Sequence, residues 1–97
     1  MILDWTELAG KDKEGYIEYI AQDNPLAAVH VGDEIERQVE ILLQQPKIGR
    51  AGRVKGTREL VIVGTPYIVA YSINGEIIHI LRVLHGALKW PKGFSHG

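Results

Sequence analysis

The sequence predicts an α+β fold in which a helical hairpin packs on a small antiparallel β-sheet. Apolar residues recur every three or four positions in the first half of the chain, which is typical of amphipathic helices. The second half holds β-branched runs separated by turn signals. A length of 97 residues allows one hydrophobic core and not two, so we expect residues 1–97 to form a single domain.

The first half predicts a short strand and then two helices. Residues 2–5 alternate in polarity as a strand does, and Thr6 is a suitable N-cap for the helix that follows. One face of that helix is apolar and consists of Leu8, Tyr16, Ile17, Ile20 and Ala21. The pair Asn24-Pro25 ends this helix and begins the next, because Asn caps helices well and Pro fits a first turn.

The second helix is expected from Pro25 to Gln45, where Pro46 stops it. Its apolar face consists of Ala28, Val31, Ile35, Val39 and Leu42. Two helices joined by so short a corner must lie antiparallel, and their shared apolar face needs a cover.

The second half predicts a basic, flexible connector over residues 47–56 and then an antiparallel meander. The expected strands are residues 59–63, 67–71 and 76–84, and Asn74-Gly75 is a strong hairpin signal. Both faces of these strands are apolar. Either a bound partner segment fills the second face, or the first strand and the C-terminal tail close a small core.

The charge is divided unequally along a chain whose net charge is −1. Residues 1–46 hold three basic and ten acidic residues, a balance of −7, whereas residues 47–97 hold eight basic and two acidic residues, a balance of +6. A basic half indicates a surface for an acidic partner, either nucleic acid or a negatively charged protein segment. Alternatively, the two halves face each other and partly neutralise.

Several classes of protein are excluded by composition and motifs. The chain has no cysteine, and its four histidines are too scattered for a metal site, so we expect no metal and no cofactor. No apolar run approaches the length of a membrane span and no leader is recognisable, which predicts a cytoplasmic protein without a membrane partner. Hydrolase and phosphate-loop motifs are also missing.

The remaining candidates for chemistry are cationic and aromatic residues near the C-terminus. Arg82 interrupts an apolar strand, so its guanidinium should be paired or lie at the sheet surface. His85 would lie on the opposite face of an unbroken strand from Arg82, and the two share a site only if the strand bends near Gly86. Tyr67 and Tyr71 share a strand face that is more typical of a core.

Taken in order, these pieces resemble the RelE/ParE superfamily of bacterial toxins over residues 2–91, with residues 92–97 as a tail. The resemblance rests on the Asp-Asn-Pro corner at 23–25, the glycine-arginine stretch with Thr-Arg-Glu-Leu-Val at 49–61, Pro-Tyr-Ile-Val at 66–69, Ile-Leu-Arg-Val-Leu-His-Gly-Ala at 80–87 and Trp-Pro at 90–91. It implies a helical hairpin on a twisted antiparallel sheet, and a cognate antitoxin protein that wraps around the toxin.

The superfamily has two main activities, and the chain resembles the ParE-like members more. RelE-like members cleave messenger RNA on the ribosome, whereas ParE-like members poison DNA gyrase. Where ribonuclease members carry lysines, this chain has Glu59 and Val61, and Ile68 stands where a basic residue is expected. The resemblance therefore favours gyrase poisoning, with growth arrest and plasmid maintenance as its consequences, and RNA cleavage as the alternative.

Three sets of site residues follow from this hypothesis. The surface that binds the target is expected to comprise Arg50, Arg53, Lys55, Arg82, Lys89 and Trp90. The surface that binds the antitoxin is expected to comprise Val39, Leu42, Tyr67 and Tyr71. Under the ribonuclease alternative, catalysis would fall to Arg58, Glu59, Arg82 and His85. The toxin-antitoxin complex would bind operator DNA through the antitoxin.

Overall fold

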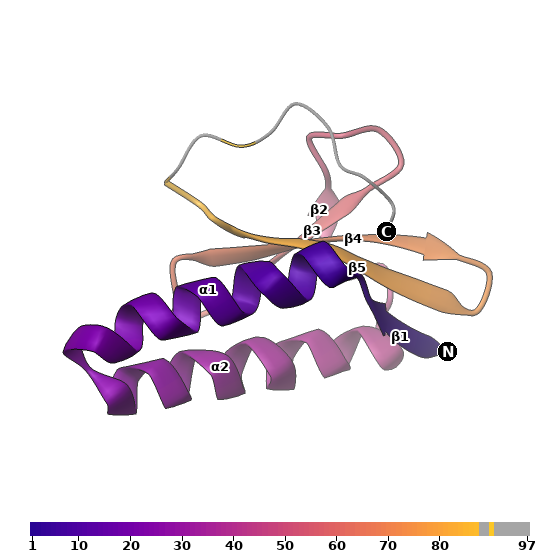
Figure 1. The fold of residues 1–97 in the computed structure, drawn as a ribbon. Helices are drawn as coiled ribbons and strands as arrows, with labels where there is room; N and C mark the ends of the chain where they lie inside the picture. Colours follow the sequence, from indigo (N-terminus) through magenta and orange to yellow (C-terminus); the bar gives the residue numbers. More distant parts are fainter. Residues whose placement is uncertain (88–89, 91–97) are drawn as a thin grey trace.

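The helical hairpin and the sheet are both present in the computed structural model, which describes residues 1–87 and residue 90 (Figure 1). The elements in chain order are β1 (Ile2–Trp5), α1 (Glu7–Asp23), α2 (Pro25–Glu40), the 3₁₀ turn η1 (Ile41–Leu43), β2 (Arg50–Ala51), β3 (Arg58–Val61), β4 (Tyr67–Asn74) and β5 (Ile77–His85). The two helices lie together on one face of the sheet (Figure 1). In the described part of the chain, no helix has the length and apolar character needed to cross a bilayer.

The sheet has five strands in the order β1-β5-β4-β3-β2. Strands β2 to β5 pair antiparallel, as the meander predicts. β1 differs, because it pairs in parallel with β5, from Ile2 opposite Ile77 to Trp5 opposite Ile80. The parallel orientation needs a long crossover connection, which the helical hairpin and the meander supply. The sheet is therefore mixed rather than wholly antiparallel.

Both predicted helix caps are present. The Thr6 hydroxyl accepts a hydrogen bond from the Ala9 amide and donates one to the Leu81 carbonyl, so it caps α1 and joins it to β5. The Asn24 side chain accepts from the Ala27 amide, and Pro25 occupies the first turn of α2. These caps fix the corner of the hairpin.

Two details of the helices differ from expectation. Ala9, rather than the exposed Leu8, is the buried residue of the first turns of α1. The α-helical part of α2 ends at Glu40 and not at Gln45, because the chain tightens into η1 before it turns toward β2. The Tyr71 hydroxyl holds this turn by donating to the Pro46 carbonyl.

The glycine-rich stretch after α2 makes close contacts and includes a short strand, where the sequence predicted a connector without regular structure. A Cβ at Gly49 would lie 2.6 Å from the Tyr71 hydroxyl oxygen, and one at Gly52 would lie 2.2 Å from Thr57 Oγ1. These glycines let the backbone pass close to neighbouring groups, and this close approach is the reason for glycine here rather than conformational flexibility. Between them, Arg50 and Ala51 form the short edge strand β2.

The chain covers both faces of its central strand β4. Residues from Tyr67 to Ser72 are all buried, although neighbouring side chains point to opposite faces. Ile35, Val39 and Leu42 of the α2 region pack on the helix side of the sheet, with Tyr71 among their neighbours. The expectation that a partner segment fills an open apolar face of the sheet is therefore wrong for β4.

Candidate functional site

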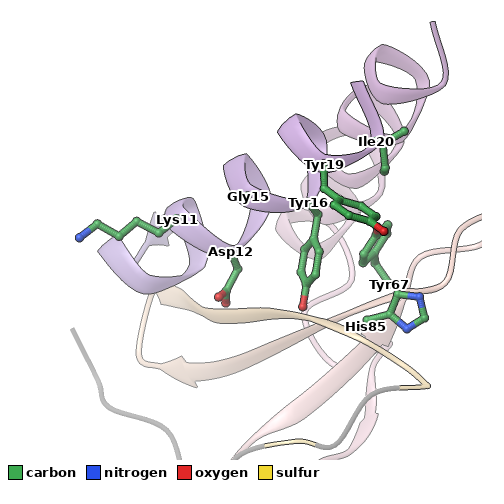
Figure 2. A pocket seen from close by; sticks show the side chains of 8 residues that line it. All are labelled: Lys11, Asp12, Gly15, Tyr16, Tyr19, Ile20, Tyr67 and His85. Carbon is green, nitrogen blue, oxygen red and sulfur yellow. The ribbon is translucent and has the colours of Figure 1, made fainter. Parts of the chain in front are cut away.

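A cleft opens where α1 passes over the start of β4 and the end of β5. Its volume is about 720 Å³, and its lining includes the rings of three tyrosines and one histidine (Figure 2). The residues that line it are Lys11, Asp12, Gly15, Tyr16, Tyr19, Ile20, Tyr67 and His85.

Three rings form a connected group in this cleft. Tyr67 begins β4 and pairs across the sheet with His85, which ends β5, and their rings meet edge to face with centroids 5.5 Å apart. The Tyr16 ring reaches down from α1 to Tyr67, with centroids 4.7 Å apart. Burial raises the pKa of Tyr67, so its hydroxyl stays neutral at physiological pH.

His85 is the imidazole of this group. Its Nδ1 accepts a hydrogen bond from the Ala87 amide at 3.1 Å, which assigns the ring hydrogen of the neutral form to Nε2. The side chain is half-buried and lines the cleft. His85 could therefore donate a hydrogen bond or exchange a proton with a bound group.

Arg82 is paired with Asp12 of α1. The guanidinium donates from Nε and from Nη2 to the two carboxylate oxygens, at 2.7 and 3.0 Å, and the Val83 amide donates to the same carboxylate at 3.0 Å. The side-chain hydrogen bond with Asp12 raises the pKa of Arg82 further above its ordinary value. Of the two placements that the sequence allowed for this arginine, the paired one holds.

A β-bulge explains where Arg82 points. β5 has one extra residue, Leu81, because Tyr71 pairs with Ile80 while Ala70 pairs with Arg82. The extra residue shifts the alternation of side chains, so that Val83 rather than Arg82 enters the core. His85 and Arg82 thus leave opposite faces of β5, as expected for the two positions.

Glu59 and its two arginines form a separate group at the other side of the sheet. The Glu59 side chain is 2% exposed, and it accepts from Arg50 Nη2 at 3.1 Å and from the Arg53 amide at 2.8 Å. A buried carboxylate needs such partners. Arg50 and Arg53 pair with Glu59 while their own side chains stay 55% and 52% exposed, so their contact with a target stays a prediction. The structure does not bring Glu59 together with His85.

The other predicted basic residues have separate environments. Arg58 donates to the carbonyl of Gly49 at 2.8 Å and to that of Lys47 at 3.2 Å, so it supports the turn before β2. Lys55 is exposed in the β2–β3 loop. Lys89 lies outside the described residues.

Trp90 lies between the β2–β3 loop and the end of β5. Its ring is stacked against the Arg53 guanidinium, with 3.6 Å from Cζ to the ring centroid. Its indole Nε1 donates to the His85 carbonyl at 3.1 Å. Trp90 is therefore held by the β2–β3 loop on one side and by the end of β5 on the other.

The residues predicted to bind the antitoxin are all in the core. Val39, Leu42 and Tyr71 are no more than 1% exposed and Tyr67 is 5% exposed. A side chain buried by its own chain is not available to a partner without unfolding. The assignment of Val39, Leu42 and Tyr71 to a docking surface was therefore wrong, whereas Tyr67 also lines the cleft under α1.

Sequence reasoning missed Asp12 and Tyr19 as neighbours of the site and placed Tyr16 only on a buried helix face. A lone arginine in an apolar strand signals a partner carboxylate, but any of the five acidic residues of α1 could have supplied it. The β-bulge decided the choice, and no local sequence signal marks it. Among the described residues, no group of three or more His, Asp or Glu is placed to hold a metal ion.

Comparisons with known proteins agree with one another. Residues 3–90 match the family model described as the ParE toxin of the type II toxin-antitoxin system parDE. The chain is 40% identical over 88 residues to the putative toxin Y4kP of Sinorhizobium fredii, with 91% of each chain covered. It is 34% identical to toxin RelE2 of Caulobacter vibrioides, with 86% of this chain and 92% of the relative covered.

A solved structure has the same fold. It is described as a chromosomal ParDE toxin-antitoxin system from P. aeruginosa, and it superposes with a TM-score of 0.78 and 28% identity over 86% of this chain and 92% of that chain. The expected fold class, two helices on a small open sheet, is thereby confirmed. A toxin of a type II system has an antitoxin as its partner, and this chain belongs to the ParE toxin family of type II toxin-antitoxin systems.

Proposed function

We propose that this toxin arrests growth by poisoning DNA gyrase rather than by cutting messenger RNA. The ParE family membership and the likeness to a ParDE system support this choice. The observation that carries it is the dispersal of the groups that RNA cleavage would need.

Cleavage of RNA through its 2′-hydroxyl needs a base, an acid and cationic support around one phosphate. In this chain the proposed base, Glu59, is enclosed by arginines, and the Arg82 guanidinium is held by Asp12. Arg58 donates to main-chain carbonyls. Of the four proposed catalytic residues, His85 alone lines the cleft. Binding to a protein or DNA surface needs no such convergence.

The proposed target surface lies around the β2–β3 loop and Trp90. Lys55 is exposed there, and the partly exposed Trp90 stacks on Arg53 of the same loop. Lys89 precedes Trp90 in the sequence and adds a positive charge to this segment. Such a surface suits an acidic protein or DNA partner.

The experiment that tests this proposal exposes two targets to the same purified toxin. Gyrase with supercoiled DNA should accumulate protein-linked linear DNA when the toxin is added, while a translating ribosome should leave its message intact. Cuts within translated codons and no trapped gyrase would overturn the proposal.

One observation favours the ribonuclease alternative. His85 lies in an aromatic cleft with Tyr16 and Tyr67, where a base could stack and a proton could move. In that case His85→Ala would abolish RNA cleavage in the ribosome assay without loss of the fold.

We place the antitoxin on the helical hairpin, because the side chains of the central strand β4 are buried by the chain itself. The groove between α1 and α2 is lined by apolar and small residues, which include Ile17, Ala28 and Gly32, and by the charged residues Lys13, Asp33 and Glu36. Leu26 is 83% exposed and Val29 60% exposed on α2. Side chains this large and exposed are typical of a contact with a partner.

The cellular role follows from this pairing. We propose that the toxin acts in the cytoplasm, that the toxin-antitoxin complex binds operator DNA through the antitoxin, and that release of the toxin serves plasmid maintenance. The toxin should co-purify with its antitoxin, and separation of the two by size exclusion at micromolar concentration would contradict this pairing.

A further inference from the structure

Arg53 links Trp90 to a buried carboxylate. The Arg53 amide donates to Glu59 Oε2 at 2.8 Å, and its guanidinium Nε lies 3.9 Å from the same oxygen. The other side of this guanidinium covers the Trp90 ring at 3.6 Å. One arginine therefore connects the interior of the β2–β3 loop to Trp90, which lies five residues after the end of β5.

The chemistry of the contact requires arginine at this position. A planar guanidinium can stack on an indole face while its N–H groups point at a carboxylate, whereas a lysine ammonium cannot do both. Glu59 is too deeply buried to remain unpaired, so its charge keeps the loop folded around it. The carboxylate thus orients Arg53, and Arg53 orients Trp90.

Arg50 provides an internal comparison. It donates to Glu59 from Nε and Nη2, at 3.3 and 3.1 Å, and pairs with Glu59 across β2 and β3. Its described contacts do not include Trp90, in contrast to those of Arg53. The two arginines share a carboxylate and differ in the aromatic contact.

We propose that Arg53, oriented by Glu59, is a positioning residue that fixes Trp90 against the β2–β3 loop and so shapes the surface that engages the target. This inference rests on the proposed function, in which Trp90 belongs to that surface. Arg53 itself acts through Trp90 and not by direct contact with the target.

The first test follows the indole itself. In a Trp5→Phe background Trp90 is the one remaining tryptophan of the sequence, and its fluorescence reports its surroundings. Arg53→Ala and Arg53→Lys should shift the emission to longer wavelength and raise acrylamide quenching several-fold. Arg50→Ala should leave both close to the parent values. Unchanged emission in Arg53→Ala, or an equal change in Arg50→Ala, would overturn the proposed link.

The second test connects this contact to toxicity. Arg53→Ala and Arg53→Lys should lose growth arrest while they retain the circular dichroism of the parent and bind antitoxin. Trp90→Phe, which keeps a stacking ring, should arrest growth more strongly than Trp90→Ala. Arg37→Ala removes an arginine from α2 that pairs with Glu34, and it serves as the control for loss of one positive charge. Full growth arrest by an Arg53→Ala toxin whose Trp90 has moved would overturn the functional half of the proposal.

The outcome also separates this inference from the gyrase proposal. If the parent toxin fails to trap gyrase, but Arg53→Ala still releases Trp90 and still loses growth arrest, the positioning role stands and the choice of target falls. If gyrase is trapped equally by the parent and by Arg53→Ala, the target stands and the positioning role falls.

Discussion

At the scale of single residues, Asp12 shows how one carboxylate can organise a site. It receives three hydrogen bonds from β5, two from the Arg82 side chain and one from the Val83 amide. These bonds occupy the edge of β5 beyond the four residues that pair with β1. Asp12 therefore completes the attachment of α1 to the sheet and removes Arg82 from the set of available cations.

Replacement of Asp12 by Asn should destabilise the fold. The Arg82 guanidinium would keep its charge and lose its partner, and hydrogen bonds to charged groups contribute about 2 kcal/mol each to stability. We expect a loss of about 2 kcal/mol in the free energy of unfolding, measured by urea denaturation. Asp23→Asn, at the exposed end of α1, is the matched control. Equal stability of the two variants would show that the Asp12 bonds contribute little.

Two glycines should respond to alanine in opposite directions. At Gly49 a methyl group would lie 2.6 Å from the Tyr71 hydroxyl oxygen, so Gly49→Ala should cost about 1–3 kcal/mol through overpacking. At Gly15, inside α1, nothing lies within 4 Å of the added atom, so Gly15→Ala should stabilise the helix by about 0.5–1 kcal/mol. Thermal unfolding of both variants checks the signs, and a stabilised Gly49→Ala would contradict the close packing at the start of β2.

Stability should fall at alkaline pH. Burial is the main reason that the pKa of both Tyr67 and Tyr71 is raised above 10.0. A raised pKa means that the folded state favours the neutral phenol. The contribution of this phenol to the free energy of unfolding is complete below pH 10 and is lost as the pH rises through the folded-state pKa. The midpoint of urea unfolding should therefore decrease above about pH 10, and Tyr71→Phe should reduce this decrease. An unchanged pH profile in Tyr71→Phe would exclude Tyr71 as a source of the effect.

At the scale of elements, the hairpin exposes a surface that the strands do not. Leu26 and Val29 project from α2 beside the groove between the helices. The central strand β4 meanwhile buries its side chains from Tyr67 to Ser72, and the exposed Val61 and Val63 lie near the end of β3. The hairpin is therefore the element on which changes can weaken the antitoxin complex without disturbing the core.

The double variant Leu26→Asp/Val29→Asp should weaken antitoxin binding at least tenfold and leave the fold intact. The exposed side chains cost nothing to replace in the free toxin, whereas two unpaired charges in an apolar contact are costly in the complex. Titration calorimetry measures the change. Val61→Asp/Val63→Asp, two exposed valines near the end of β3, controls for added charge. A larger loss in the control pair would move the contact to the sheet side.

The elements were predictable from local signals, and their connections were not. Thr6 and Asn24-Pro25 mark helix starts through hydrogen bonds within a few residues, so sequence reveals them. The parallel pairing of β1 depends on a strand more than seventy residues away, and the order at Gly49 depends on the Tyr71 hydroxyl. Such contacts have no local signature.

At the scale of the whole molecule, the two oppositely charged halves of the chain form more ion pairs within themselves than with each other. Most ion pairs in the described part of the chain lie within one half, such as Lys13 with Glu36 and Arg50 with Glu59. Arg82 with Asp12 joins the halves, together with His79 and Asp4 of the paired strands β5 and β1. The expectation of an uneven surface is consistent with this distribution.

The site was predictable in composition more than in geometry. Arg82, His85 and Trp90 stand out in the sequence because they are charged or aromatic groups in an apolar context, and their roles at a target stay predictions. Their partners come from α1 and the β2–β3 loop, which long-range packing brings to the sheet. The alternation of the sequence placed Arg82 and His85 on opposite faces, but it gave no signal for the bulge at Leu81, which brings Val83 into the core.

The measurement that tests the central claim most directly is gyrase trapping by the His85→Ala toxin beside the parent. The claim is that toxicity comes from a binding surface around Trp90 and not from proton transfer at His85, whose side chain faces the separate cleft under α1. His85→Ala should therefore accumulate protein-linked linear DNA to the same extent as the parent, and Trp90→Ala should accumulate much less. Two results together would contradict the claim. The His85→Ala toxin would fold and bind antitoxin but lose all growth arrest, and the parent toxin would cut messages within translated codons.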